Sequence, residues 1–192
     1  MLLTTMRQTF LYTLLAIGCI TQSCTSSSSA AAGETVAGNE TIAALLQPNE
    51  EGIPYPIYEK YDDVAALLNQ NDNKTYVINF WATWCGPCVA ELPYFEQLAE
   101  ETADDNVQLV MVSLDFQRDV RKKLKSFVLN RPLELPVIAL ADADYNSWID
   151  RVDSRWGGAI PVTVIYRNGK REFHSEKFES YDELKAAVDQ VR

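Results

Sequence analysis

The centre of this sequence reads WATWCGPC, from Trp81 to Cys88. A short apolar run over 76–81 predicts a strand, and apolar residues at helical spacing predict an amphipathic helix over 87–101. Pro87 suits the first turn of that helix, where its missing N–H costs nothing. The two cysteines of this stretch are therefore predicted to lie where a buried strand turns directly into a helix.

This placement gives the two thiols different chemistry. A thiolate at a helix N-terminus faces unpaired backbone N–H groups and the positive end of the helix dipole, so its pKa falls. Cys85, the first of the pair, is therefore the predicted nucleophile. Cys88 shares a helix face with Leu92 and Phe95, the face expected to pack on the sheet. A buried Cys88 thiol is well placed to resolve a mixed disulfide held on Cys85.

Three other interpretations of the pair are weaker. A zinc knuckle needs a second Cys-x-x-Cys or a His pair, and the chain has one histidine, His174. A purely structural disulfide between Cys85 and Cys88 would close too short a loop to stabilise the fold much. A copper-binding or metallochaperone module would need further His or Met ligands, and none of the three methionines is well placed. The pattern favours redox chemistry, with no metal site.

Outward from the motif, helix-like and strand-like segments alternate along the chain. Strands are expected over 107–114, 136–140, 162–166 and 172–174, and helices over 61–69, 118–129, 145–152 and 181–191. Asn168-Gly169, between the last two strands, is the strongest hairpin signal in the chain. This order predicts an α/β fold with a central mixed sheet and helices on both of its faces.

The motif resembles the active site of a known family. WATWCGPCVAELP, from Trp81 to Pro93, is similar to the signature of the TlpA/ResA-like branch of thioredoxin-family thiol–disulfide oxidoreductases. Cys-Gly-Pro-Cys is shared with thioredoxin itself, whereas Glu91 and Pro93 are more particular to the envelope branch. The resemblance extends over about 53–192. It implies a thioredoxin fold with one extra central helix–strand–helix passage.

A second landmark of the family lies later in the chain. The segment from Gly157 to Thr163 resembles the loop that lies against the dithiol. The resemblance implies that the Ile160–Pro161 peptide bond is cis and that the backbone at Ile160 pairs with an extended substrate segment. The motif residues expected to border the docked substrate are Trp84, Gly86 and Pro87.

One position departs from thioredoxin. The buried carboxylate in thioredoxin's second strand corresponds to Asn79 here, and an amide cannot take a proton from the buried thiol. Glu91, three residues after Cys88 and so near it on the helix surface, is the predicted replacement base. The ResA-like pattern resembles this arrangement. The alternative is that Glu91 faces water or simply favours the N-terminal half of its helix.

Composition limits the partners. The 192-residue chain is long enough for one domain with extra segments, and its net charge is −10, with acidic residues scattered along it. No basic stripe is present to bind phosphates, so nucleic acid is not an expected partner. No Gly-rich dinucleotide loop or flavin site is visible, so no cofactor is expected. A monomer is expected, and the resemblance implies a membrane electron donor of the DsbD/CcdA type.

The N-terminal region has the pattern of an export signal. Arg7 precedes an apolar run over 10–20, which has the length of a signal-peptide core and is too short to span a membrane. Residues 1–24 are expected to be a signal peptide with a lipoprotein-type cleavage box. A flexible linker is expected over 25–52, with at most one helical turn at its short apolar cluster over 42–46, and the thioredoxin-like domain over 53–192.

Two cysteines close this apolar run, and each follows a small residue, as in a lipoprotein cleavage box. Cys24 is the favoured lipid anchor, because a Ser-rich tether follows it and cleavage there leaves no spare thiol in an oxidising compartment. Cys19 has the better apolar lead-in and is the alternative. A plain secretory signal without lipid is a further alternative.

These features predict a membrane-tethered periplasmic oxidoreductase that reduces the disulfides of envelope proteins. The Gly-Pro pair between the cysteines is thioredoxin-like, and thioredoxin has a potential of about −270 mV against about −120 mV for the oxidant DsbA. A disulfide oxidase or isomerase would differ only in this potential, so it remains the alternative. The sequence leaves the substrate open between apocytochrome c, an oxidatively damaged envelope protein and others.

Overall fold

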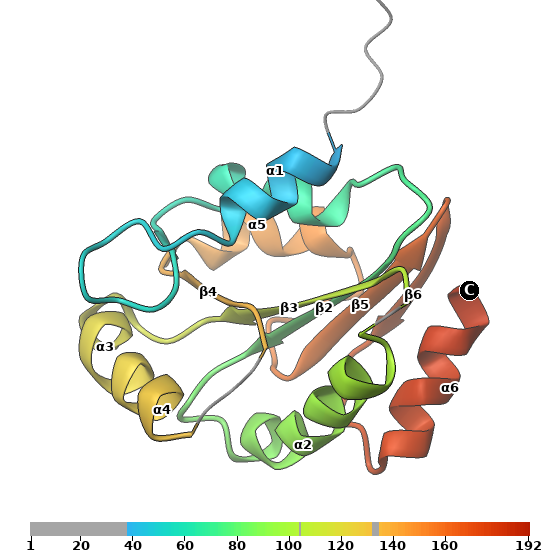
Figure 1. The fold of residues 1–192 in the computed structure, drawn as a ribbon. Coiled ribbons are helices and arrows are strands. Elements are labelled where there is room, and N and C mark those ends of the chain that lie inside the picture. The colour runs from blue at the N-terminus through green and yellow to red at the C-terminus, as the bar shows by residue number, and fades with distance from the viewer. Residues whose placement is uncertain (1–37, 104, 132–134) are drawn as a thin grey trace, which may run out of the picture. The chain divides into compact units, whose positions relative to one another are not determined.

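The computed structural model describes residues 38–103, 105–131 and 135–192, and a six-stranded sheet lies at the centre of these residues (Figure 1). The strands are β1 Ile57–Tyr58, β2 Thr75–Trp81, β3 Val107–Ser113, β4 Val137–Leu140, β5 Val162–Arg167 and β6 Lys170–His174. Their order in the sheet is β1-β4-β3-β2-β5-β6. The β1–β4, β4–β3 and β3–β2 pairs are parallel, whereas β5 runs antiparallel to both β2 and β6. The predicted mixed sheet is confirmed.

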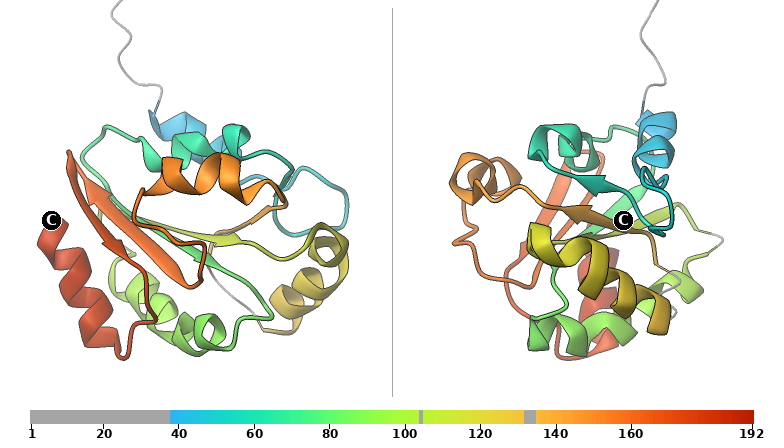
Figure 2. Two further views of the ribbon diagram at one scale, coloured as in Figure 1. Left: turned by 180° about the vertical axis from the view of Figure 1, so that it is seen from behind. Right: turned by 90° about the vertical axis from the view of Figure 1, so that its left-hand side faces the viewer.

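Helices cover both faces of the sheet, as predicted. The α-helices are α1 Gly38–Leu45, α2 Gly86–Glu101, α3 Gln117–Asp119, α4 Lys125–Asn130, α5 Tyr145–Val152 and α6 Tyr181–Val191. Figure 1 and Figure 2 show α2 and α6 on one face, and α1 and α5 on the other. The region predicted as a helix over 61–69 forms two short 3-10 segments instead, Tyr61–Asp63 and Ala65–Leu68.

The central strand β2 is buried along its whole length, because it lies between β3 and β5 and is covered on both faces. Alternate side chains of a strand point to opposite faces. Val77 and Trp81 join the core that includes residues of α2 and α6, whereas Ile78 and Phe80 join the core that includes residues of α5. The strand therefore fixes the start of the WATWCGPC turn between two packed layers.

The extra passage implied by the family resemblance lies between β3 and β5. It consists of α3 to α4, then β4, then α5. The predicted helix over 118–129 forms as α3, a π-helical turn over Val120–Leu124 and α4 in succession. Val120 and Leu124 are fully buried, and the Tyr55 hydroxyl donates to the carbonyl oxygen of Val120. The α3–α4 part of the passage is therefore packed against the same core as α2, whereas α5 packs in the core on the other face of the sheet.

Helix α1 lies within the range 25–52, which the sequence predicts as a linker with at most one helical turn. It spans 8 residues, and its Ile42 is only 2% exposed. Ile42 packs in the same hydrophobic cluster as Tyr61 and Leu67. Burial of its apolar side chain against these residues stabilises the packing of α1 on the domain. The packed part of the chain therefore begins before residue 53.

The expected signal peptide over 1–24, with Cys19 and Cys24, lies outside the described residues. Across the parts of the chain that the structure describes, no helix combines the length and apolar character needed to cross a bilayer.

Candidate active site

The two motif cysteines form a disulfide at the start of α2. Their sulfurs are 2.02 Å apart and their Cα atoms 5.3 Å apart. Cys85 is the N-cap residue of α2, and the Cys88 N–H donates to its Sγ at 3.3 Å. Cys85 is 5% exposed and Cys88 is 0% exposed. The strand–turn–helix placement predicted from the sequence is confirmed, and Cys85 carries the more accessible sulfur.

The surroundings of Cys85 favour a thiolate once the disulfide is reduced. Its side chain faces the free N–H groups at the start of a 16-residue helix, and no acidic residue lies in the first turn of that helix. The positive end of the helix dipole therefore acts on the sulfur, and no carboxylate in the first turn of α2 offsets it. This arrangement supports the predicted role of Cys85 as the attacking residue.

A buried aspartate, which the sequence reasoning missed, holds the turn before Cys85. Asp115 is 1% exposed, and its Oδ2 accepts from the Thr83 N–H at 3.0 Å and from the Ser113 hydroxyl at 2.8 Å. The Thr83 hydroxyl donates to Oδ1. Asp115 lies two residues after the end of β3, and parallel neighbours end at the same edge of a sheet, so this signal was present in the sequence. The turn is thereby tied to the neighbouring strand.

The second family landmark lies against the disulfide. The Ile160–Pro161 peptide bond is cis, as the resemblance implied. The Ile160 carbonyl oxygen lies 3.7 Å from the Cys85 Sγ. The loop is held further by Trp156, whose indole N–H donates to the Ala159 carbonyl oxygen at 2.7 Å. Ile160 therefore borders the accessible sulfur directly.

An apolar groove of about 340 Å³ opens beside this loop. Trp84 and Phe116 are both exposed and stack on one another, with ring centroids 5.6 Å apart. Other residues that line the groove include Tyr145, Ile149, Trp156 and Ile160. Gly86 and Pro87 are also exposed, at the start of α2. Of the residues that the sequence predicted to border a substrate, Trp84 and Ile160 line this groove, together with Phe116 and Tyr145, which the sequence did not single out.

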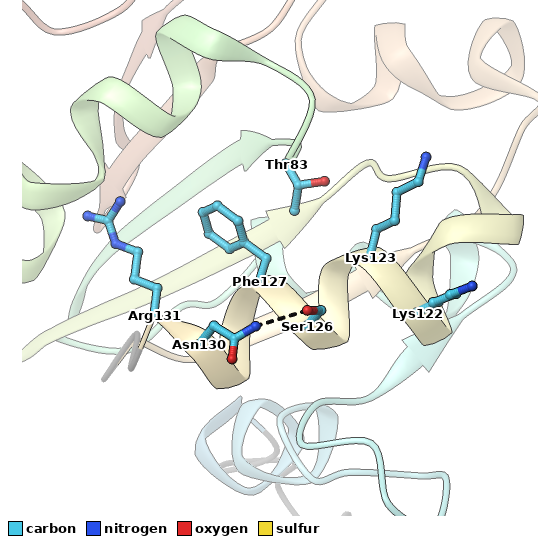
Figure 3. Close-up of a pocket in the computed structure, with 7 residues that line it drawn as sticks. All are labelled: Thr83, Lys122, Lys123, Ser126, Phe127, Asn130 and Arg131. Carbon is cyan, nitrogen blue, oxygen red and sulfur yellow. Dashed lines mark hydrogen bonds between the residues drawn. The ribbon is translucent and has the colours of Figure 1, made fainter.

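A second cavity, of about 600 Å³, borders Thr83 (Figure 3). Its lining from the α3–α4 passage is Lys122, Lys123, Ser126, Phe127, Asn130 and Arg131. Lys123 pairs with Asp119 at 3.1 Å, and Arg131 pairs with Glu96 at 3.2 Å. The turn before Cys85 therefore lies between an apolar groove and a cavity with a basic rim.

Glu91 is fully buried, so the alternative in which it faces water is wrong. Its Oε1 accepts from the Asn79 Nδ2 at 3.0 Å, and its Oε2 accepts from the Phe178 N–H at 2.9 Å. Burial raises the pKa of Glu91 to about 7, because the charged carboxylate loses its hydration. The two N–H donors and the nearby Lys177 ammonium limit this rise, since each favours the carboxylate. A carboxyl that titrates near neutrality suits proton exchange with a thiol.

The raised pKa of Glu91 predicts a pH-dependent stability. The unfolded chain has the ordinary glutamate pKa of 4.5, so between about pH 4.5 and pH 7 the native state keeps a proton that the unfolded state has lost. The free energy of unfolding therefore falls as pH rises through this window. Relative to Glu91→Gln, the wild-type protein should lose roughly 2–3 kcal/mol between pH 5 and pH 8. Urea unfolding at both pH values measures this difference, and parallel stability curves for the two proteins would contradict it.

The lone histidine and two of the tryptophans are packing residues. His174, in β6, stacks on Phe178 with ring centroids 4.0 Å apart. Trp81 is buried against Phe127, and Trp148 stacks on Tyr61. In the three described ranges, no group of three or more His, Cys, Asp or Glu side chains is arranged to hold a metal ion.

Comparison with known proteins agrees with this geometry. The sequence model of the Redoxin family matches residues 60–170. The thiol-disulfide oxidoreductase ResA of Oceanobacillus iheyensis is 44% identical over 59 residues, which is 31% of each chain. The sporulation thiol-disulfide oxidoreductase A of Bacillus subtilis is 25% identical over 96 residues, covering 50% of this chain and 58% of that one. These alignments thus span from about a third to just over half of each relative.

Solved structures share the fold. A thioredoxin-related protein from Neisseria meningitidis serogroup B superimposes with a TM-score of 0.53 at 23% identity, covering 62% of this chain and 86% of that chain. A thioredoxin family protein from Chlorobium tepidum TLS gives a TM-score of 0.52 at 22% identity, covering 66% and 83%. The thioredoxin-like fold and the TlpA/ResA-like resemblance are both confirmed. With a match over more than half of its length, the chain belongs to the Redoxin family.

Proposed function

We propose that this protein is a thiol–disulfide oxidoreductase that reduces the disulfides of proteins in the bacterial cell envelope. The observation that carries the proposal is the Cys85–Cys88 disulfide at the N-terminus of α2, with one accessible sulfur beside the Ile160–Pro161 loop. A dithiol in this place can exchange with a disulfide in an extended segment of another protein.

The proposed reaction has two exchange steps. In the reduced protein the Cys85 thiolate attacks a substrate disulfide, which forms a mixed disulfide and releases one substrate thiolate that takes up a proton. Cys88 then gives its proton to Glu91 and attacks the Cys85 sulfur. This second step restores the Cys85–Cys88 disulfide and releases the other substrate thiolate. Two electrons pass from the dithiol to the substrate, and an external donor must replace them.

The groove beside the disulfide supports a protein substrate. An extended segment can lie along the Ile160 backbone while a neighbouring apolar side chain enters the groove beside Trp84 and Phe116. Exposed aromatic residues of this size are typical of recognition surfaces. The proposed substrate class is therefore a protein disulfide flanked by apolar residues in an extended or unfolded segment.

The direction of the reaction gives a test of this function. The two residues between the cysteines are Gly86 and Pro87, as in thioredoxin, so the reduction potential should lie nearer about −270 mV than about −120 mV. Equilibration of the purified protein with glutathione buffers, followed by quantification of the Cys85–Cys88 disulfide, measures this potential. A value at the oxidising end would assign the protein to the oxidase or isomerase alternative.

Location and electron supply complete the proposal. The apolar run at residues 10–20 and the two cysteines at its end support export, with lipid attached at Cys24 or, failing that, Cys19. A membrane carrier of the DsbD/CcdA type is the proposed electron donor, because each turnover consumes two electrons that the chain cannot regenerate itself. Disulfide-bearing envelope proteins, apocytochrome c among them, are the proposed substrates.

A further inference from the structure

Asn79 gives both hydrogens of its side-chain amide to other side chains. It lies in the buried strand β2, where its Nδ2 donates to Glu91 Oε1 and to Thr163 Oγ1, both at 3.0 Å. Asn79 is 1% exposed, and its Oδ1 has no hydrogen-bond partner among the described residues. A buried polar atom without a partner is costly, so this amide is poorly explained by the stability it brings to the core. The N–H donors of the Asn79 amide, and not its oxygen, make the hydrogen bonds in this site.

We propose that Asn79 is a positioning residue that holds the Glu91 carboxylate ready to take a proton from Cys88. The inference deepens the proposed function and rests on it, because it assigns Glu91 the proton of the resolving thiol. Glu91 has two oxygens, and each is held by one N–H: Oε2 by the Phe178 backbone and Oε1 by Asn79. An ionised carboxylate only accepts hydrogen bonds, so two donors fix both its orientation and its charged form.

Of the two hydrogen-bond donors to Glu91, Asn79 is the one that belongs to a side chain. The Phe178 N–H belongs to the backbone, so only proline at this position would remove it, and proline would also constrain the backbone there. Lys177 and Glu183 act on the carboxyl with opposite signs, from the segment that leads into α6 and from α6 itself. From the sheet, β2 and β5 contribute the uncharged Asn79 and Thr163. Asn79 is therefore the side chain of the sheet that stabilises the ionised form of Glu91 relative to its neutral form.

The test replaces Asn79 with leucine, which has a similar volume and removes the donor. Loss of one hydrogen bond to the carboxylate should raise the Glu91 titration midpoint by about one pH unit. Carbon-13 NMR of glutamate side chains in the full-length oxidised protein follows this midpoint, with the Glu91 signal assigned by its loss in Glu91→Gln. At pH 7 fewer molecules then carry the ionised base, so resolution of a mixed disulfide should slow about fivefold and recover as pH rises. Attack by Cys85 should be unaffected.

Two further variants sharpen the test. Thr163→Val removes the other partner of the amide and leaves the Asn79 donor on Glu91, so the Glu91 midpoint should move much less than in Asn79→Leu. Asn79→Asp places a second carboxyl at hydrogen-bond distance from Glu91. The pair should titrate in two steps, with the upper step above the wild-type midpoint. This variant keeps the proposal testable where the leucine variant does not fold, as judged by near-UV circular dichroism.

The outcomes separate this proposal from the proposed function. An unchanged Glu91 midpoint in Asn79→Leu, or a midpoint that moves without any change in the pH profile of resolution, overturns the role of Asn79. Both results leave disulfide reduction by the wild-type protein intact. Failure of the wild-type protein to reduce protein disulfides removes the proposed function instead, and the NMR midpoint still reports whether Asn79 controls the carboxyl.

Discussion

Replacing Cys88 with serine should stop the reaction halfway and leave the protein covalently joined to its substrate through Cys85. The hydroxyl of serine is not ionised near neutral pH and cannot displace a thiolate from the mixed disulfide. Cys88 lies one helical turn from Cys85, and the described residues contain no third cysteine that could replace it. Turnover should fall by a factor on the order of a thousand or more, as expected when a nucleophile is lost. Mass spectrometry of the trapped adduct under non-reducing conditions checks both the loss and the site of attachment.

The matched control is Cys85→Ser, which removes the accessible sulfur and keeps the buried one. This variant should form no adduct, because Cys88 at 0% exposure cannot meet a protein disulfide. Adducts of equal yield from the two variants, or attachment through Cys88, would reverse the proposed order of attack.

Glu91→Gln should slow the resolving step by about 10- to 100-fold at neutral pH, toward the low end of general-base contributions. The Cys88 thiol must lose its proton in an apolar setting that raises thiol pKa values. Glu91 is buried on the same helix with a pKa raised to about 7, so a large fraction of molecules carries the ionised base at neutral pH. The first attack should change less, since the start of α2 stabilises the Cys85 thiolate. Stopped-flow traces across pH separate the two steps.

A suitable control on the same helix is Glu100→Gln. Glu100 is exposed, so this substitution makes the same chemical change away from the site. It should leave both steps at wild-type rates. Resolution in Glu91→Gln at the rate of Glu100→Gln would show that Glu91 has no part in the proton transfer.

The local features of the site could be predicted from the sequence because they depend on neighbours along the chain. The apolar run of β2 and the helical spacing after Cys88 are short-range patterns, and they place the dithiol at a helix start without knowledge of the rest. The hairpin between β5 and β6 is equally local: Asn168 and Gly169 both adopt positive φ angles, 48° and 83°, as such a turn requires.

The features that sequence reasoning left open depend on contacts between distant segments. Whether Glu91 faces water or the core is decided by Phe178, whose N–H binds it from 87 positions away. The Thr83–Asp115 contact spans 32 positions and depends on the parallel pairing of β2 with β3. Helix α1 is longer than the single turn that the sequence allowed at this apolar cluster, and its buried Ile42 has its partners in the domain. Periodicity along a chain carries no information about such partners.

The unequal exposure of the two sulfurs has a consequence for how the protein meets its partners. A thiolate from outside can approach the disulfide only at Cys85, because Cys88 is covered. In the proposed cycle, the electron donor that restores the dithiol would therefore form its own mixed disulfide on the same atom that attacks the substrate, beside the same groove. Donor and substrate would compete for this one sulfur and could not bind together. The proposed function thus predicts ping-pong kinetics, in which each partner leaves before the next binds.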